Sequence, residues 1–304
     1  MDHLAQRLSC LLAAVFIVSM SSLSLARPEQ RHAAQGLVLR VDSQHKVMVV
    51  SLKAIPDYMD AMTMPIAVPD EKQLSDITSG TMIDFILVSE GDSAHAESVR
   101  VHPYQGLEPD PLAARRLKLL AKVASPPPVK ALSIGDSVPD FTLTNQDGRS
   151  VSFSAFHGKI VVLNFIYTRC ALPHFCLRSS NNFGALQERF HDALGRDMVL
   201  VTVTFDPVHD SPDALKKYAQ KWHAESSRWH FLTGSEAEIR RVCALFGEDY
   251  FPDEGLMDHS LHTAIIGRDG RLMSNLEGNE FTSQQLSDLV GTVLPGNPAG
   301  TPHR

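Results

Sequence analysis

The sequence lacks several features that mark common protein classes. It has no internal repeat, and its low-complexity sequence is limited to the short run Ser125–Pro128, which we interpret as a stiff linker. The formal net charge is −7, and no basic cluster opposes it. Nucleic acid is therefore not an expected partner, because its binding depends on gathered positive charge.

Cysteine is also scarce. The 304 residues include four cysteines, and Cys10 lies in an N-terminal apolar run that we expect to be removed. Exported chains usually pair their cysteines for stability. A bridge between Cys170 and Cys176 would enclose five residues and would stabilise little through chain entropy. This close pair is better suited to chemistry than to cross-linking, and Cys243 is left as an odd thiol.

The first thirty residues predict export. Arg7 precedes an apolar run from Leu8 to Leu25, which closes on small residues near Ala26. This pattern is typical of a secretory signal, so residues 1–26 are interpreted as a cleaved signal peptide and the mature chain as periplasmic. The alternative is an uncleaved inner-membrane anchor, because the run is nearly long enough to span a bilayer. The polar second half of the run favours cleavage.

Removal of the signal leaves about 278 residues, enough for two domains. Residues 33–103 consist of short strands by pattern, with a turn at Ser43–Lys46. About seventy residues of short strands predict a small all-β, OB-like barrel, because closure removes exposed strand edges. Residues 104–131 are predicted to form a linker with a helical stretch at Pro111–Val123, which is followed by the proline run.

Residues 132–296 alternate between strand and helix patterns. Lys159–Thr168 and Met198–Phe205 are continuous apolar runs, typical of strands buried on both faces. Ser211, followed by Pro212, is predicted to open a helix. A hairpin around residues 268–270 and a last helix over Thr282–Leu294 complete the pattern. This order predicts an α/β thioredoxin-like domain.

The cysteine pair follows the first of these buried strands. A helix is predicted to begin near Cys176, and the positive end of a helix lowers the pKa of a thiol. We therefore expect Cys176 to gain most from the helix, with Cys170 in the preceding loop. Cys243 shares a predicted helix face with apolar neighbours, so we interpret it as a buried small hydrophobe.

An Asp258–His259 pair lies about eighty residues downstream of the thiols. Two thiols and one imidazole are a soft ligand set suited to copper, whereas the two thiols alone can cycle with a disulfide. Alternatively, His259 is a core histidine that bonds to Asp258. His262 is expected on the opposite face of a strand from His259, in a structural or surface role. His174, between the cysteines, is either a fourth ligand or a solvated side chain.

Three methionines gather in the first domain. Met59, Met62 and Met64 lie within six positions, and Met62 and Met64 would share one face of a strand. Thioethers are soft donors that select Cu(I). The alternative is that these side chains close the mouth of the barrel as flexible apolar filler.

The segment from Gly36 to about Val101 resembles the periplasmic copper-binding domain of the CusF type. Its most specific part is Ala-Met-Thr-Met-Pro at residues 61–65. The resemblance implies a Cu(I) site built on Met62 and Met64, with a histidine a few residues before the Ile-Pro step. Leu52 occupies that histidine position in this chain.

The aromatic residue that caps copper in this family aligns with Met59, with Tyr58 beside it. Having lost the imidazole, the domain is expected to bind Cu(I) through three thioethers, to bind it weakly, or not to bind it.

Four motifs occur in order along the second domain: Gly135–Leu143, Phe165–Cys170, Thr204–Pro212 and Asp258–Ser260. Through these motifs the domain resembles the Sco (SenC) family over its whole length. The resemblance implies copper ligation by Cys170, Cys176 and His259, with Asp206 beside the site. It also implies copper handling and thiol redox during assembly of the dinuclear copper centre of cytochrome c oxidase.

The chain departs from the Sco pattern around the cysteines. The usual spacing is three residues followed by proline, whereas here five residues separate the cysteines and Leu177 follows Cys176. Ala171 replaces the proline that usually follows the first cysteine. The longer loop permits both sulfurs to meet one copper ion, and it also favours tuning of the pair for disulfide exchange.

Three function classes follow from these residues. The first is a Cu(I)/Cu(II) metallochaperone whose partner is the copper-bearing subunit of cytochrome c oxidase or another cuproprotein. The second is a thiol-disulfide oxidoreductase that uses Cys170 and Cys176 to reduce partner cysteines. The third, peroxide reduction, is disfavoured because Thr168 stands two residues before Cys170 instead of three. His259 separates the first two classes, since copper binding needs it and exchange does not.

Overall fold

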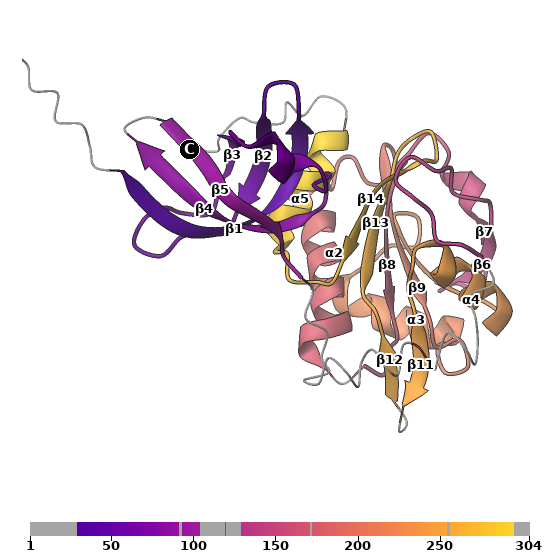
Figure 1. Cartoon of the computed structure of the whole chain (residues 1–304). Coiled ribbons are helices and arrows are strands. Elements are labelled where there is room, and N and C mark those ends of the chain that lie inside the picture. The colour runs from indigo at the N-terminus through magenta and orange to yellow at the C-terminus, as the bar shows by residue number, and fades with distance from the viewer. Residues whose placement is uncertain are drawn as a thin grey trace, which may run out of the picture.

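The computed structural model describes residues 29–90, 93–103, 119, 129–170, 172–253 and 256–294. These residues form a small barrel and a larger sheet with helices packed against it (Figure 1). The predicted signal and, apart from Leu119, the predicted helix at Pro111–Val123 lie outside the described residues. Within the described part, no helix has the length and apolarity needed to cross a membrane.

The first body is a closed five-stranded barrel in the order β1-β2-β3-β5-β4. The predicted turn at residues 43–46 joins β1 to β2. The strands place apolar side chains such as Val38, Val50 and Ile66 in a fully buried core. The strands are β1 (Gln30–Asp42), β2 (Val47–Leu52), β3 (Thr63–Ala67), β4 (Met82–Glu90) and β5 (Ser93–Val101), with a short 3-10 helix, η1, at Glu71–Leu74.

The second body is built on a seven-stranded sheet in the order β14-β13-β8-β9-β10-β6-β7. Every residue of β8 and β9 is buried, as their continuous apolar runs predicted, and the two strands pair in parallel at the centre. The strands are β6 (Thr142–Asn145), β7 (Ser150–Ser152), β8 (Ile160–Ile166), β9 (Met198–Thr204), β10 (Trp229–Thr233), β13 (His262–Ile266) and β14 (Leu272–Glu277).

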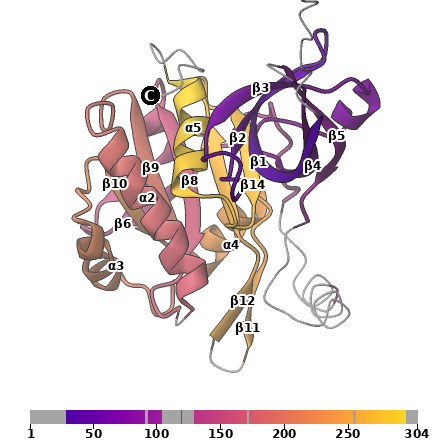
Figure 2. The same ribbon diagram turned by 90° about the vertical axis from the view of Figure 1, so that its left-hand side faces the viewer.

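Four α-helices accompany this sheet, and α2 and α5 lie side by side against it (Figure 2). Ser211 caps α3 as predicted, by accepting a hydrogen bond from the amide of Ala214. Thr282 forms a capping box at the start of α5, which fixes the last predicted helix. The thioredoxin-like order is confirmed. The helices are α2 (Arg178–Arg189), α3 (Pro212–Ala219), α4 (Glu236–Leu245) and α5 (Ser283–Val293), with 3-10 helices η2 (Phe153–Phe156) and η4 (Gln220–Trp222).

A separate hairpin, which the sequence pattern did not predict, projects from the end of the sheet (Figures 1 and 2). It consists of β11 (Tyr250–Asp253) and β12 (Leu256–His259), which pair with each other as a two-stranded sheet. Its sequence contains Pro252, a residue that usually argues against a central strand. The last residue of β12 is His259, so the hairpin carries one of the predicted site residues.

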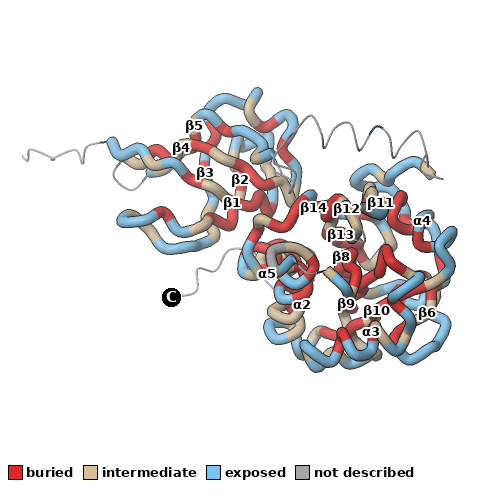
Figure 3. Tube along the Cα trace, turned by 90° about the horizontal axis from the view of Figure 1, so that it is seen from below, coloured by how far each residue is buried: buried red, intermediate tan, exposed pale blue. Residues whose placement is uncertain are grey.

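The barrel and the sheet domain meet through α5. Gln285 donates to the backbone carbonyl of Ser51 at 2.8 Å. The Asp288 carboxylate accepts from Ser51 Oγ at 2.8 Å and from Thr63 Oγ1 at 3.0 Å. Arg189, at the end of α2, pairs with the same carboxylate at 3.1 Å. The buried stretches of β1, β2 and α5 come together at this boundary (Figure 3).

Candidate metal and thiol site

Cys170 lies in the loop that leaves the carboxyl end of β8, and Asp210 fastens that loop. The Asp210 side chain is fully buried and accepts from the Thr168 amide at 3.0 Å and from Thr168 Oγ1 at 2.5 Å. It also accepts from Thr204 Oγ1 at 2.5 Å. Asp210, in the loop after β9, therefore fixes the position of Thr168, two residues before Cys170.

Asp206 supports the same loop from the neighbouring position. Its buried carboxylate accepts from Arg169 Nη2 at 2.7 Å and from His209 Nδ1 at 2.8 Å. Burial alone would raise the pKa of Asp206, but His209 and Arg169 together lower it. Asp206 thus lies beside the site as an ionised anchor for Arg169, next to Cys170.

Cys176 lies in a distorted turn that precedes α2. Residues Pro173–Leu177 form one π-type turn, in which Phe175 departs from helical geometry. The regular helix starts only at Arg178. Cys176 is 1% exposed, whereas Cys170 is partly exposed. The side chain of His174 lies outside the described atoms, so its predicted role stays a prediction.

The two thiols contact each other, and Cys170 also contacts His259. Hydrogen bonding from Cys176 lowers the pKa of Cys170 to about 4; burial opposes this shift and His259 reinforces it. Burial raises the pKa of Cys176, and the neighbouring Cys170 raises it further. The expectation that Cys176 gains most from the helix is therefore wrong. Desolvation of a buried sulfur outweighs the field of a helix whose first turn is distorted.

Tyr167, which directly follows β8, lies next to Cys170. Its ring is 1% exposed. Burial raises the pKa of Tyr167 to about 12, and the charge of the adjacent Cys170 adds to this effect. The phenol therefore stays protonated beside the Cys170 sulfur and is able to donate to it.

His259 is held among aromatic rings with its Nδ1 already engaged. Nδ1 donates to the backbone carbonyl of Ser260 at 2.5 Å. This contact leaves Nε2 as the nitrogen available to Cys170. Burial would lower the pKa of His259, but Cys170 and Glu248 outweigh it and raise the pKa to about 9. The surrounding rings are those of Tyr167, Phe175 and Phe205, with centroids 5.9, 6.3 and 4.6 Å from the imidazole.

The alternative interpretation of His259 as a partner of Asp258 is wrong. Asp258 pairs with Phe251 across the hairpin, and the contacts of His259 Nδ1 are Ser260 and Glu248. His262 and His259 also do not belong to one continuous strand, because Ser260 and Leu261 separate β12 from β13. The expected alternation of faces therefore does not apply to them.

Glu248 was missed by the sequence analysis. Its side chain is fully buried, and Oε1 lies 3.5 Å from Nδ1 of His259. Burial raises its pKa, an effect that His259 and His262 oppose. A lone glutamate after a predicted helix gives no sequence signal, since most glutamates in such positions are solvated.

Cys243 lies on the buried face of α4. It is 1% exposed, and Ile239, Val242 and Phe246 are fully buried beside it. Its interpretation as a core residue is confirmed. Burial raises the pKa of this thiol well above its usual range, which makes it a poor nucleophile.

The barrel methionines differ in their exposure. Met62 is 41% exposed, whereas Met59 and Met64 are partly buried against the barrel core. Leu52 is 2% exposed and belongs to that core. Tyr58 stacks on His32 with ring centroids 3.8 Å apart. The structure therefore places an apolar side chain at the position where the CusF-type resemblance implies an imidazole.

The described part of the chain contains no group of three or more His, Cys, Asp or Glu side chains already spaced to hold a metal ion. Cys176, Cys170 and His259 instead contact one another in series, through Cys170. The donor set itself fits a soft metal, because it offers two sulfurs and one imidazole nitrogen whose partner nitrogen is fixed.

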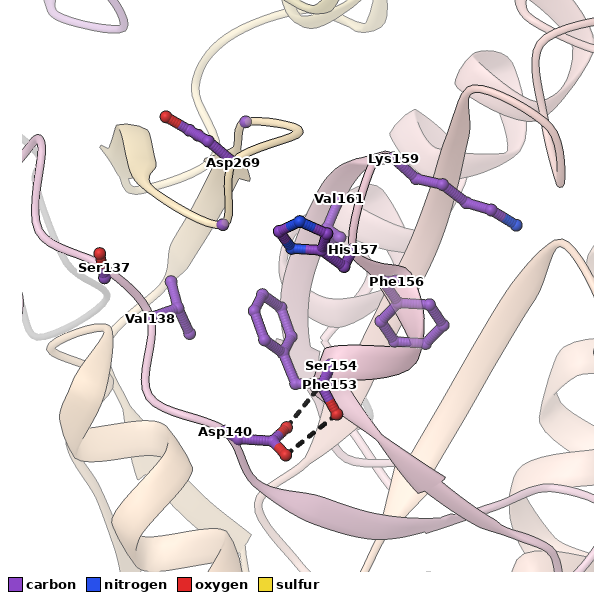
Figure 4. Close-up of a pocket in the computed structure, with 12 residues that line it drawn as sticks. Ser137, Val138, Asp140, Phe153, Ser154, Phe156, His157, Lys159, Val161 and Asp269 are labelled. Carbon is purple, nitrogen blue, oxygen red and sulfur yellow. Dashed lines mark hydrogen bonds between the residues drawn. The ribbon is translucent and has the colours of Figure 1, made fainter.

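Two hollows in the described surface lie away from these residues. A cavity of about 160 Å³ is lined by Val138, Phe153 and Phe156, and Asp140 and Ser154 are hydrogen bonded at its edge (Figure 4). It opens near Lys159, at the start of β8, whereas Cys170 follows the end of β8. A groove of about 500 Å³ runs along the barrel. Neither hollow includes the thiols.

Comparison with known proteins identifies the family of the second domain. The SCO1/SenC family model matches residues 131–294. The SCO1 protein homolog of Bacillus subtilis is 29% identical over 162 residues, which cover 51% of this chain and 80% of that protein. Protein sco1 of Schizosaccharomyces pombe is 26% identical over 161 residues, 50% of this chain and 59% of that protein. The crystal structure of Arabidopsis thaliana ScoI with copper bound is 26% identical, with a TM-score of 0.45 over 52% of this chain and 96% of that one. Because the family model spans more than half of the sequence, the chain belongs to the SCO1/SenC family.

Proposed function

We propose that this protein is a copper-binding metallochaperone of the cell envelope, which takes up copper through Cys170, Cys176 and His259. The observation that carries the proposal is that Cys170 interacts with both Cys176 and His259, although His259 comes from a distant part of the chain. The lowered pKa of Cys170 supports it, because a thiolate rather than a thiol binds metal.

Copper is the cargo that this donor set suits best. Thiolates are soft donors that select Cu(I), and imidazole binds both oxidation states well. His259 Nδ1 donates to Ser260, which leaves the lone pair on Nε2 when the ring is neutral. When bound, copper would be shared by the two sulfurs and this nitrogen, and the buried rings around His259 would keep water from that side of the ion.

The client we propose is the copper-bearing subunit of cytochrome c oxidase, whose dinuclear copper centre the protein would help to assemble, as the family resemblance implies. The surface around Cys170 is compatible with docking of a protein. Leu172 and Leu177 flank the cysteine turn and are each 38% exposed, and Val208 is 69% exposed in the adjacent loop. Exposed apolar side chains around a half-exposed ligand mark a contact surface better than an enclosed small-molecule site.

A copper titration of the reduced mature chain, residues 27–304, tests this function. We expect one copper with two sulfurs and one nitrogen in its x-ray absorption spectrum. Cys170→Ala, Cys176→Ala and His259→Ala should each weaken binding by at least about 10-fold. Cys243→Ala, which removes a buried thiol outside the site, should leave the affinity unchanged. Parent-like copper affinity of His259→Ala would remove the main support for a metallochaperone.

A second candidate, thiol-disulfide exchange, is favoured by the asymmetry of the two thiols. Cys170 is a partly exposed thiolate, and Cys176 is a buried thiol in contact with it. The Cys170 thiolate would attack a client disulfide and release one client thiolate. Cys176, on losing its proton, would then resolve the mixed disulfide, leaving a Cys170–Cys176 bridge and a reduced client. Exchange that persists in His259→Ala, together with lost copper binding, would separate the two activities.

For the barrel we propose a weak second Cu(I) site of the CusF type at Met59, Met62 and Met64. Support comes from their grouping in sequence and from the partial burial of Met59 and Met64.

We further propose that the protein works in the periplasm after cleavage near Ala26. Mass spectrometry of the N-terminus from membrane and soluble fractions tests this location, and retention of residues 1–26 would contradict it.

A further inference from the structure

Glu248 occupies a position that few glutamates occupy in a folded protein. It follows the end of α4, where Gly247 turns the chain with a positive φ of 78°. The Glu248 amide donates to the carbonyl of Cys243 at 3.0 Å, which fixes the turn. The turn directs the carboxyl group inward, where its side-chain exposure is 0%.

The Glu248 carboxyl has only weakly placed partners. In the described part of the chain, neither of its oxygens has a hydrogen-bond donor in good geometry. Oε1 lies 3.5 Å from His259 Nδ1, and the imidazole and backbone amide of His262 are the other polar neighbours of the carboxyl group. A buried carboxyl group without strong donors destabilises a fold by an amount that native proteins rarely accept away from functional sites. The position of Glu248 therefore calls for a role at His259.

Glu248 is also locked in place relative to His259. The Asp249 amide donates to Ser260 Oγ at 2.9 Å, and the Ser260 amide donates to the Asp249 carbonyl at 2.8 Å. Asn275, on β14, donates to the Phe246 carbonyl at 2.8 Å. The turn that carries Glu248 and the strand end that carries His259 thus form one unit, joined to the main sheet.

We propose that Glu248 is a positioning residue that holds the His259 ring with Nε2 directed at Cys170. With Oε1 3.5 Å from Nδ1, the carboxyl group helps the Ser260 carbonyl to keep a proton on Nδ1, so the lone pair lies on Nε2 whenever the ring is neutral. The Ser260 carbonyl belongs to the same segment as His259. Glu248 belongs to the end of α4, so it ties the orientation of the ring to the domain core.

The copper part of this inference rests on the proposed function, and the test separates the two. Glu248→Gln keeps the length and one oxygen acceptor, whereas Glu248→Met keeps the approximate volume and removes the acceptor. Glu236→Gln changes an exposed glutamate at the start of the same helix and serves as the matched control. Circular dichroism and thermal unfolding establish that each variant is folded.

The first readout needs no copper. In the reduced, metal-free chain, the shared Nδ1 proton of His259 should give a resolved, slowly exchanging resonance in proton–nitrogen spectra. We expect that signal in Glu248→Gln and Glu236→Gln, and its broadening or loss in Glu248→Met. An unchanged signal in Glu248→Met overturns the proposal, because Ser260 alone would then suffice.

The second readout is copper affinity. Loss of an outer partner of a ligand histidine typically weakens binding about 10- to 100-fold, so Glu248→Met should fall in that range. Glu248→Gln should stay within about threefold of the parent, and nitrogen coupling to Cu(II) in its electron paramagnetic resonance spectrum should persist. Equal loss in both variants overturns positioning by an oxygen acceptor. If the parent binds no copper, the metallochaperone proposal fails, and the resonance measurement still decides the role of Glu248.

Discussion

His102 Nε2 lies 2.6 Å from Oε2 of Glu280, a contact that ties the end of the barrel to the segment before α5. Nδ1 of the same ring lies 2.6 Å from Oδ2 of Asp84 on β4. Carboxylate oxygens only accept, so both contacts are satisfied together when the ring carries two protons. This boundary between the two bodies therefore contains a protonation-dependent bridge.

The first prediction concerns the pH dependence of this bridge. Burial would lower the pKa of His102, but hydrogen bonds to Asp84 and Glu280 outweigh it and raise the pKa. A raised pKa means that the bridge stabilises fully below the unfolded value of about 6.5 and loses this contribution as pH rises through the folded value. The contact between barrel and sheet domain should therefore be firmer at pH 5.5 than at pH 8.5.

Hydrogen exchange at the barrel boundary, followed from pH 5.5 to 8.5 with correction for intrinsic rates, measures this effect. His102→Gln should remove most of the pH dependence of hydrogen exchange at this boundary. His45→Gln is the matched control, because His45 is exposed at the far turn and contacts Asp42 of the barrel alone. A pH dependence that survives in His102→Gln would assign it to other groups, of which Lys53 is the nearest cation that senses both Asp84 and Glu280.

The second prediction concerns thiol reactivity. With a pKa lowered to about 4, Cys170 is a thiolate across the range from pH 6 to 8. Alkylation of the reduced chain at pH 6 should therefore modify Cys170 well before Cys176 or Cys243, whose pKa values burial raises. Peptide mapping by mass spectrometry gives the order. Faster labelling of Cys176 would reverse our assignment of the nucleophile.

The third prediction concerns oxidation. Cys170 and Cys176 are in contact, whereas Cys243 is buried in the core beneath α4. Mild oxidation should therefore form a Cys170–Cys176 bridge and leave Cys243 as a free thiol. Bound copper should slow both oxidation and alkylation, because the thiolates are then occupied. Detection of Cys243 in the bridge would contradict the structure.

The fourth prediction concerns the anchor of the cysteine loop. Asp210→Asn retains the shape of the side chain but replaces one of its two acceptor oxygens with an amide nitrogen. The three donors from Thr168 and Thr204, which use both oxygens in the parent, then share one acceptor. We expect a loss of about 1–3 kcal/mol in the free energy of unfolding, together with slower labelling of Cys170 at pH 6. Asp213→Asn, an exposed acid in the first turn of α3, should change the unfolding free energy by less than about 0.5 kcal/mol. Urea unfolding compares them.

The fifth prediction concerns the barrel. With Cys170 and Cys176 both changed to serine, residual Cu(I) binding should depend on Met59, Met62 and Met64. Thioethers do not titrate, so the affinity should be nearly flat between about pH 5 and 8, unlike a histidine site, which weakens below about 6.5.

Two variants at residue 52 sharpen this test. Leu52→His should strengthen binding and add acid sensitivity, whereas Leu52→Met should add a sulfur without it. Because Leu52 belongs to the barrel core, each variant must first be shown to be folded. A steep loss of binding near pH 6 in the parent would point to a histidine such as His45, His95 or the half-buried His32.

Much of the second domain could be predicted because its signals are local. The continuous apolar runs of β8 and β9 and the caps at Ser211 and Thr282 act over a few residues, and each appears where the pattern placed it. The convergence of His259 on Cys170 came from a family resemblance rather than from spacing. Nothing within either segment alone indicates that the two meet.

The remaining features depend on contacts between distant segments. The order of the two thiol pKa values follows from which sulfur is buried, and a helix pattern does not show that. Among the described strands, β11 and β12 pair with each other alone, and their sequence lacks the continuous apolar run that marked β8 and β9. Glu248 and the His102 bridge each join residues from separate elements, and their chemistry exists only once the fold has formed.

Asp288 links the methionine region of the barrel to the cysteine region of the sheet domain. One carboxylate receives Thr63, which stands between Met62 and Met64, and also Arg189, which ends the helix that begins just after Cys176. The strand that carries Met64 and the helix that follows Cys176 are therefore both bound to the Asp288 carboxylate. The described bodies should tumble in solution as one particle, with a single rotational correlation time. Asp288→Ala should weaken this junction but not separate the bodies, because the contacts Gln285–Ser51 and His102–Glu280 remain.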